Sequence, residues 1–436
     1  MFLGCTGRRA LWFRASTASG YVNTGSSMLA SATHVLHARL APAEALVDER
    51  RTLYRLAVGL FAPGTRLSDN LADHPIVRYE IGRALAGHGG LDPARLREAA
   101  EMRVRDVGVA IAADPRAADV LEAPLRIVAP PGTSPRPLTE ADGERFDTAV
   151  GVVADGVRLL RRLAPAMADD LLAHVSMLAV LKAETSGGVV SASSRYVPGV
   201  VLIDEPSAPI EVAEALVHEG AHEKFFDLAI TREFLDASAE DAEYFETSWS
   251  HARWPLEQTF AAWHAYSCLA QFYLLRGTEQ LGPHSLLPKA RERAAEIGDW
   301  LLAHEGDLRA DARWLLRALT GEPAVEVEEQ PLKDVAVSRE ISKGDCFSVL
   351  PDVTCQRARS GRVVVGRATQ PPTIFWLAPD ASWVVDRLRH DGTPISFELM
   401  LPDAIKEWAV DPATAGQRLG VALDSLLMSS IIQSNS

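Results

Sequence analysis

The chain has 436 residues, of which 47% are hydrophobic and 23% are charged, enough apolar material for a sizeable core and for two or three domains. The formal net charge of -14 argues against general binding to nucleic acids or to anionic membranes. The four cysteines form no CxxC pair, which argues against a cysteine-based zinc site and fits a reducing compartment. No apolar run reaches the length that a membrane-spanning helix needs, so the sequence predicts a soluble, cytoplasmic protein.

The N-terminal 27 residues differ from the rest in charge. Arg8, Arg9 and Arg14 occur among serine, threonine and glycine, and no acidic residue precedes Glu44. This pattern can be read as a targeting peptide, but it has no apolar stretch long enough for a secretory signal. We therefore interpret residues 1–27 as a disordered or artificial extension and expect the folded part to begin near Met28.

Residues 28–322 are predicted to form a mainly α-helical domain with one or few short strands. A β-branched run at residues 200–203, bounded by turn residues, is typical of a buried strand. Apolar residues recur at helical spacing before this run, in residues 96–113, 146–163 and 166–182. Helices are expected again after it, in residues 210–230, 256–275, 289–304 and 307–319.

The composition changes after residue 322. Residues 323–340 are acidic and flanked by proline, as expected for a linker. Short strand patterns follow at residues 348–350, 362–366 and 373–377, and helical patterns at residues 382–388, 395–401 and 415–432. This order predicts that residues 341–436 form a separate, small α+β domain of winged-helix type.

The segment 218–222 reads His-Glu-Gly-Ala-His, an HExxH motif inside the predicted helix 210–230. Residues four apart lie on one face of an α-helix, so His218 and His222 can direct two imidazoles at one metal ion. In zinc peptidases the glutamate of this motif, here Glu219, acts as general base on metal-bound water. The sequence therefore predicts a metal site at His218 and His222. The alternative, two surface histidines on an ordinary helix, fits the apolar flanks of the motif less well.

A third metal ligand is expected downstream of the motif. The candidates are Glu243, Glu246, His251, Glu257 and His264. His264 lies in the middle of an apolar helix, where a buried histidine must hydrogen-bond or bind something. We predict His264 as the third ligand. Glu257, on roughly the same helix face, is the second candidate, and a core histidine satisfied by hydrogen bonds is the alternative for His264.

The residues around the motif resemble a family of HExxH proteins that are encoded with ribosomally made peptide natural products. The matching positions are residues 198–202 and 216–222, Ser248, Trp249, Arg253, Pro255, Leu256, Trp263, His264 and Ala265. In that family a proline-leucine pair, a short helical run and then a histidine follow the HExxH helix. The resemblance covers about residues 30–320.

The resemblance implies an iron(II)- and 2-oxoglutarate-dependent enzyme that hydroxylates a side-chain β-carbon in a ribosomally made precursor peptide. His218, His222 and His264 match the family's iron ligands, and Glu219 would accept a hydrogen bond beside the metal instead of acting as a base. The distal carboxylate of 2-oxoglutarate needs a cation, and Arg253 is the nearest candidate by sequence. We expect an Arg-Pro-Leu triplet from the family, but Trp254 separates this arginine from the proline here.

Residues 341–436 resemble PqqD-like peptide-recognition modules, which capture the leader region of a precursor peptide as an added strand. A structural or dimerisation domain is the alternative for this region. Two other functions also fit the residues of the chain. A zinc metallopeptidase would use Glu219 as general base, and a non-catalytic peptide-binding protein would have a degenerate site. Imidazole suits both iron and zinc, so the type of ligand does not decide between these metals.

Overall fold

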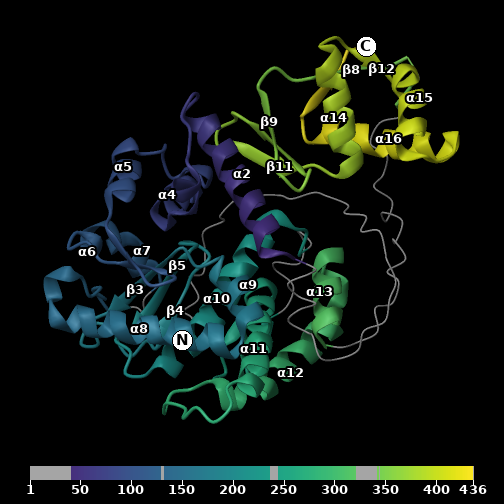
Figure 1. The fold of residues 1–436 in the computed structure, drawn as a ribbon. Helices are drawn as coiled ribbons and strands as arrows, with labels where there is room; N and C mark the ends of the chain where they lie inside the picture. The colour runs from purple at the N-terminus through teal and green to yellow at the C-terminus, as the bar shows by residue number, and fades with distance from the viewer. Residues whose placement is uncertain (1–40, 129–131, 236–243, 321–340, 343, 436) are drawn as a thin grey trace.

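The computed structural model describes residues 41–128, 132–235, 244–320, 341–342 and 344–435. Within these ranges the fold is mainly helical with a few small sheets (Figure 1). The expected N-terminal extension, residues 1–27, and the expected linker, residues 323–340, lie outside the described residues. Every described helix is too short or too polar to cross a lipid bilayer.

The largest sheet has the strand order β1-β2-β3-β5-β4. Its strands are β1 (Val104–Asp106), β2 (Ala110–Ala112), β3 (Met177–Leu181), β4 (Ser191–Ala192) and β5 (Val200–Asp204). β3 and β5 are parallel, with Met177 opposite Val200, and β4 pairs antiparallel with β5 at the edge. Alternate side chains of β3 and β5 enter two different apolar cores, so both faces of the sheet are buried.

Helices cover both faces of this sheet. The helical segments before β3 are α2 (Ala43–Phe61), α3 (Asp69–Asp73), α4 (Pro75–Leu85), α5 (Pro93–Glu101), α6 (Ala117–Val120), α7 (Glu122–Val128), η1 (Glu140–Asp142), α8 (Glu144–Leu163) and α9 (Pro165–Leu172). Those after β5 are α10 (Pro209–Thr231), α11 (Leu256–Leu275), α12 (Leu287–Ala303), η3 (Glu305–Asp307) and α13 (Ala310–Thr320). One core joins the sheet to α8, α9, α10 and α11, and the other joins it to α2 and α4.

The structure confirms the strand predicted at residues 200–203 and the helices predicted at 146–163, 210–230 and 256–275, but two other predicted helices are wrong. Residues 166–182 contain the short α9 and then β3, because a continuous apolar run suits a strand buried on both faces as well as a buried helix. In residues 96–113, α5 ends at Glu101 and the β1–β2 hairpin follows. Gly108 takes a φ of 94° in its turn, a conformation that glycine adopts without strain.

The C-terminal part combines two three-stranded antiparallel sheets with three helices. Its strands are β8 (Cys346–Val349), β9 (Val353–Arg357), β10 (Val363–Arg367), β11 (Thr373–Trp376), β12 (Ile395–Ser396) and β13 (Ile432–Ser434), in the orders β11-β10-β9 and β12-β8-β13. Its helices are α14 (Pro379–Asp391), α15 (Phe397–Trp408) and α16 (Pro412–Met428). The sequence patterns predicted β8, β10, β11 and the three helices, but not β9, β12 or β13, and they placed residues 395–396 of β12 in a helix.

One face of the β11-β10-β9 sheet packs on α2 (Figure 1). Gly366 of β10 approaches α2 so closely that an added Cβ would lie 2.6 Å from Leu60 Cδ1. The Trp376 indole also donates a 3.0 Å hydrogen bond to the carbonyl oxygen of Ile230, near the end of α10. At the same junction the wholly buried Glu49 of α2 pairs with Arg362, 3.1 Å away. The C-terminal sheet is therefore bonded both to α2 and to the end of the helix that carries the HExxH motif.

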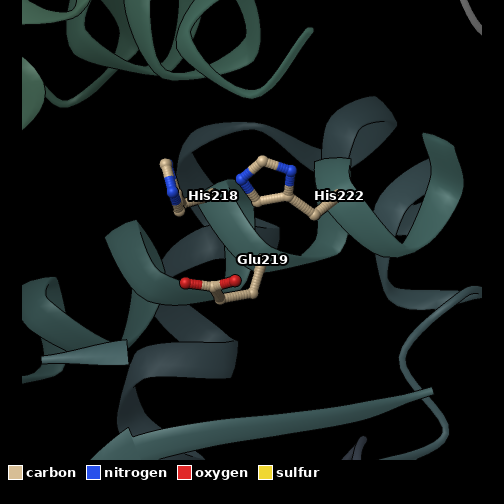
Figure 2. A group of neighbouring side chains, drawn as sticks. All are labelled: His218, Glu219 and His222. Atoms are coloured by element: carbon tan, nitrogen blue, oxygen red, sulfur yellow. The ribbon is translucent and has the colours of Figure 1, made fainter. Parts of the chain in front are cut away.

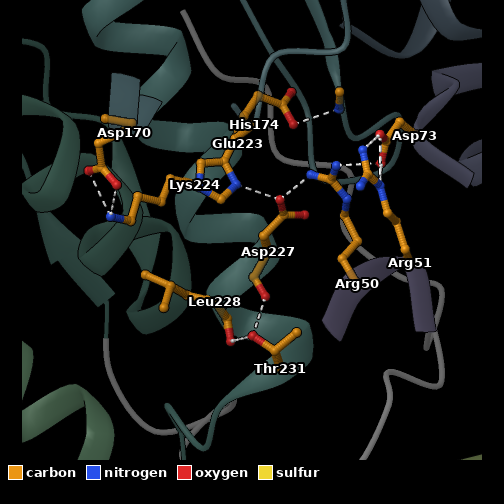
Figure 3. A network of polar contacts seen from close by, with 12 residues as sticks. Arg50, Arg51, Asp73, Asp170, His174, Glu223, Lys224, Asp227, Leu228 and Thr231 are labelled. Carbon is orange, nitrogen blue, oxygen red and sulfur yellow. Dashed lines mark hydrogen bonds and ion pairs between the residues drawn. The ribbon is translucent and has the colours of Figure 1, made fainter. Parts of the chain in front are cut away.

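A buried carboxylate ties α10 to the helices around it (Figure 3). Asp227 has no exposed surface and pairs with Arg50 of α2 and with Arg78 of α4, the latter at 2.9 Å. His174 follows α9 in the chain, and its Nδ1 lies 2.6 Å from the same carboxylate. Burial alone would raise the pKa of Asp227, but the two guanidinium groups hold that pKa below its usual value. The carboxylate is therefore charged and joins three segments that are distant in sequence.

Two neighbouring residues of α10 add to this network (Figure 3). Lys224 Nζ lies 2.7 Å from both carboxylate oxygens of Asp170 on α9, and both side chains are almost wholly buried. Glu223 accepts a 2.6 Å hydrogen bond from the backbone N–H of Gly199, just before β5. Buried polar and charged groups of this kind are tolerated only with partners, so α10 is fixed to α9 and to the sheet as well.

Asp227→Asn should destabilise the protein by about 3–5 kcal/mol, because it leaves the buried Arg78 without a counter-ion and removes one of the two carboxylates that pair with Arg50. The free energy of unfolding in urea is the measurement. Asp155→Asn is the matched control, because Asp155 forms an exposed ion pair with Arg158 and its loss should leave that free energy nearly unchanged. Equal stability of the two variants would contradict the importance of the buried network.

Candidate metal centre

Helix α10 brings His218, Glu219 and His222 together (Figure 2). One potential ligand atom of each residue lies within 4.8 Å of those of the other two, and among the described residues this is the cluster with metal-binding spacing. The two imidazole rings have their centroids 4.8 Å apart, and 8% of His218 and 4% of His222 are exposed. The i and i+4 spacing therefore puts two imidazoles side by side, as the sequence predicts.

The surroundings keep both imidazoles neutral. Burial lowers the pKa of His218 and lowers that of His222 further, because the charged forms of His218 and His264 would repel it. A neutral imidazole is the form that binds a metal ion. His218 Nδ1 is also buried without a hydrogen-bond partner among the described residues. Burial and the neutral form therefore make both imidazoles suitable ligands for a cation.

Glu219 is held by two serines of the sheet edge. Ser191 Oγ of β4 donates to one carboxylate oxygen at 2.7 Å, and Ser193 Oγ donates to the other at 2.6 Å. The side chain is 2% exposed. In Figure 2 its carboxylate lies below the two imidazole rings. The sequence does not indicate this role of the two serines, because nothing local links a serine to a glutamate 26 or 28 residues later.

His264 lies on α11, which packs against α10, and is wholly buried. Its Nδ1 lies 2.9 Å from the carbonyl oxygen of Ala221, inside the HExxH segment. Since a carbonyl only accepts, Nδ1 carries the proton and the ring's lone pair lies on Nε2. Metal-binding histidines commonly have this second hydrogen bond. His264 lies outside the cluster formed by His218, Glu219 and His222, so its role as third ligand stays a prediction.

The other candidates for the third ligand have different surroundings. Glu257, in the first turn of α11, forms an ion pair with Arg195. Glu246 belongs to β6 (Tyr244–Glu246), is exposed and lies 3.5 Å from the exposed His251. Glu243 lies outside the described residues. Glu257 therefore already has a cationic partner, and the hairpin residues face solvent.

Arg253, the predicted cosubstrate ligand, lies on the exposed side of β7 (Arg253–Pro255). Its guanidinium carbon is 5.0 Å from the ring centroid of Tyr244. Trp254 points the opposite way, is buried, and contacts the rings of Phe245 and Trp249. Since neighbouring side chains of a strand alternate between faces, the residue between Arg253 and Pro255 fills an aromatic cluster while Arg253 faces outward.

A different arginine, which the sequence patterns do not indicate, lies near the histidines. Arg293 of α12 donates a 2.8 Å hydrogen bond to the hydroxyl of Tyr266, and the ring of Tyr266 lies 5.8 Å from that of His218. The positive charge of Arg293 contributes to the lowered pKa of His218, after burial. The sequence holds no signal for this position, since Arg293 stands in a charged helix 75 residues after His218.

No protein-family model matches this chain, and no curated protein matches it.

His218→Ala or His222→Ala should weaken the binding of Co(II) and Zn(II) by more than about 100-fold, because loss of a ligand exceeds the effect of losing a supporting hydrogen bond. Isothermal titration of the metal-free protein measures these affinities. His251→Ala, an exposed histidine, is the control and should bind as the wild type does. Unchanged metal affinity in the first two variants would show that the two imidazoles are not ligands.

His264→Gln tests the third ligand. A glutamine amide can still donate to the Ala221 carbonyl, but it lacks the imidazole lone pair. We expect Co(II) affinity to fall by roughly 10–100-fold while the thermal unfolding temperature of the metal-free protein changes little. If the unfolding temperature falls and the Co(II) affinity stays the same, His264 is a core histidine and the prediction is wrong.

Proposed function

We propose that this protein is an iron(II)- and 2-oxoglutarate-dependent oxygenase that hydroxylates a side-chain β-carbon in a ribosomally made precursor peptide. His218, His222 and His264 would hold the iron, and three neutral imidazoles leave coordination positions for a cosubstrate and oxygen. When bound, the iron would supply the oxidising chemistry that side chains lack. The proposal is supported by two buried, neutral imidazoles on α10 and by the position of His264 beside them.

The environment of Glu219 carries the choice of an oxygenase over a peptidase. A general base needs a carboxylate oxygen within hydrogen-bond reach of the water that it deprotonates. In this protein Ser191 and Ser193 donate to both oxygens of Glu219. Such a carboxylate is suited to orient neighbouring groups beside a metal. A zinc peptidase remains the second candidate because one oxygen of Glu219 still lies within 4.8 Å of the histidine ligand atoms.

The same proposal gives each of the two parts of the chain a role. Residues 28–322 would form the helical HExxH catalytic domain, and residues 341–436 a PqqD-like, winged-helix-like domain that binds the leader region of the peptide. The three-stranded sheet with β9 and β11 at its edges supports this view, because an extended peptide can add to such an edge. Arg253 stays the sequence-based prediction for binding 2-oxoglutarate, and its exposed position on β7 weakens that prediction.

The decisive assay uses protein loaded with iron(II) without air, then mixed with 2-oxoglutarate and oxygen. We expect succinate to form slowly even without peptide. His222→Ala should abolish it, and Glu219→Gln should retain activity within about 10-fold because an amide can still bond the serines. Succinate is measured by mass spectrometry. In parallel, the zinc-loaded protein is incubated with casein, an unstructured peptidase substrate.

The outcomes separate the three functions. One outcome is that the zinc form cleaves casein, that Glu219→Gln abolishes the cleavage, and that the iron form makes no succinate. This outcome would establish the peptidase and contradict the oxygenase proposal. Absence of turnover with either metal would favour the non-catalytic peptide-binding protein.

A further inference from the structure

The guanidinium of Arg293 is held between two aromatic rings. Its central carbon lies 4.7 Å from the ring centroid of Trp249 and 5.3 Å from that of Tyr266, and Nη1 donates to the Tyr266 hydroxyl at 2.8 Å. Within the described part of the chain, no carboxylate lies at ion-pair distance from it. A guanidinium has five N–H donors, so this one keeps most of its hydrogen-bonding capacity for another group.

Tyr266 connects this guanidinium to the histidine pair. Its ring lies 5.8 Å from the ring of His218 in an edge-on contact, and the guanidinium lies on the same ring. The Arg293 guanidinium carbon lies 5.3 Å from the Tyr266 ring centroid, so its distance from the His218 ring cannot exceed these 5.3 Å and 5.8 Å taken together. Trp249 is only half-buried and also contacts Tyr266, with ring centroids 6.0 Å apart. The guanidinium of Arg293, flanked by two aromatic rings, therefore lies beside the candidate metal centre.

Two other arginines near the site are arranged differently. Arg253 is exposed and stacks on Tyr244. Arg195, which follows the serines that bind Glu219, is paired with Glu257. Arg293 differs from Arg253 because it lies close to His218, and from Arg195 because no described carboxylate balances its positive charge.

We propose that Arg293, positioned by Tyr266 and Trp249, binds the distal carboxylate of a small 2-oxo dicarboxylate whose other end lies at the histidine pair. This inference rests on the proposed function and replaces Arg253 as the cosubstrate ligand. A guanidinium fork matches a carboxylate with two parallel hydrogen bonds, and the aromatic rings cover the methylene groups between the two ends of the ligand.

The test compares two probes that differ in one group. 2-Oxoglutarate and pyruvate share the 2-oxo acid, but only 2-oxoglutarate has a distal carboxylate. Their dissociation constants are measured by isothermal titration, without oxygen, on full-length protein loaded with Co(II). The variants are Arg293→Gln, Arg293→Lys and Tyr266→Phe, with Arg253→Gln as the matched arginine control. The Co(II) absorption spectrum and the thermal unfolding temperature check that each variant keeps its metal site and its fold.

We expect the wild type to bind 2-oxoglutarate at least about 30-fold more tightly than pyruvate, a preference typical of a charge-assisted, bidentate contact. Arg293→Gln should reduce this preference to near unity by weakening 2-oxoglutarate alone. Arg293→Lys and Tyr266→Phe should keep part of the preference, because a positive charge remains, and Arg253→Gln should keep all of it.

Three results would overturn the assignment. The first is a full preference in Arg293→Gln, the second is its loss in Arg253→Gln instead, and the third is a wild type that binds both probes equally or not at all. A different result would contradict the proposed function without contradicting this assignment. If the preference depends on Arg293 and the iron-loaded wild type forms no succinate, the carboxylate site is supported and the oxygenase proposal is wrong.

Discussion

Two buried arginines and one carboxylate fix the helix on which the candidate site is built. Asp227 lies five residues after His222, on another side of α10, and its charge is shared between Arg50 of α2 and Arg78 of α4. Taking three charges out of water is costly, so this arrangement persists only while all of them remain in contact. The position and rotation of α10, and with them the direction of its histidines, follow from these contacts and from the pair of Lys224 with Asp170.

This explains why α10 has no polar, solvent-facing side. Glu214, Glu219, Glu223, Lys224 and Asp227 are all buried, together with His218 and His222. Ordinary surface helices place such residues in water. Here each carboxylate has partners from a different direction, such as the serines of the sheet edge for Glu219 and the backbone of Gly199 for Glu223. The sheet and the surrounding helices are therefore all bonded to α10.

The sequence predicted those features that depend on residues close together in the chain. It located α10 to within one residue at each end, and the i and i+4 spacing of His218 and His222 was enough to place two imidazoles together. It mistook residues 177–181 for helix because a strand buried on both faces has no alternating pattern to reveal it. Contacts between distant residues were out of reach. Ser191 and Ser193 beside Glu219, and Arg293 beside Tyr266, depend on how the sheet edge and α12 pack, which spacing along the chain does not encode.

The contact of the C-terminal sheet with α2 and α10 limits how this chain can be recombined. Residues 41–320 alone would expose the face of α2 that packs against Val364 and Trp376, and the carbonyl of Ile230 would lose its indole donor. Glu49 would also lose one of its two arginine partners, while Arg232 would remain. A C-terminal module transplanted from another protein would therefore need a matching tryptophan and arginine on its sheet, or α2 would have to be exchanged with it. The two parts are expected to be inherited as a pair.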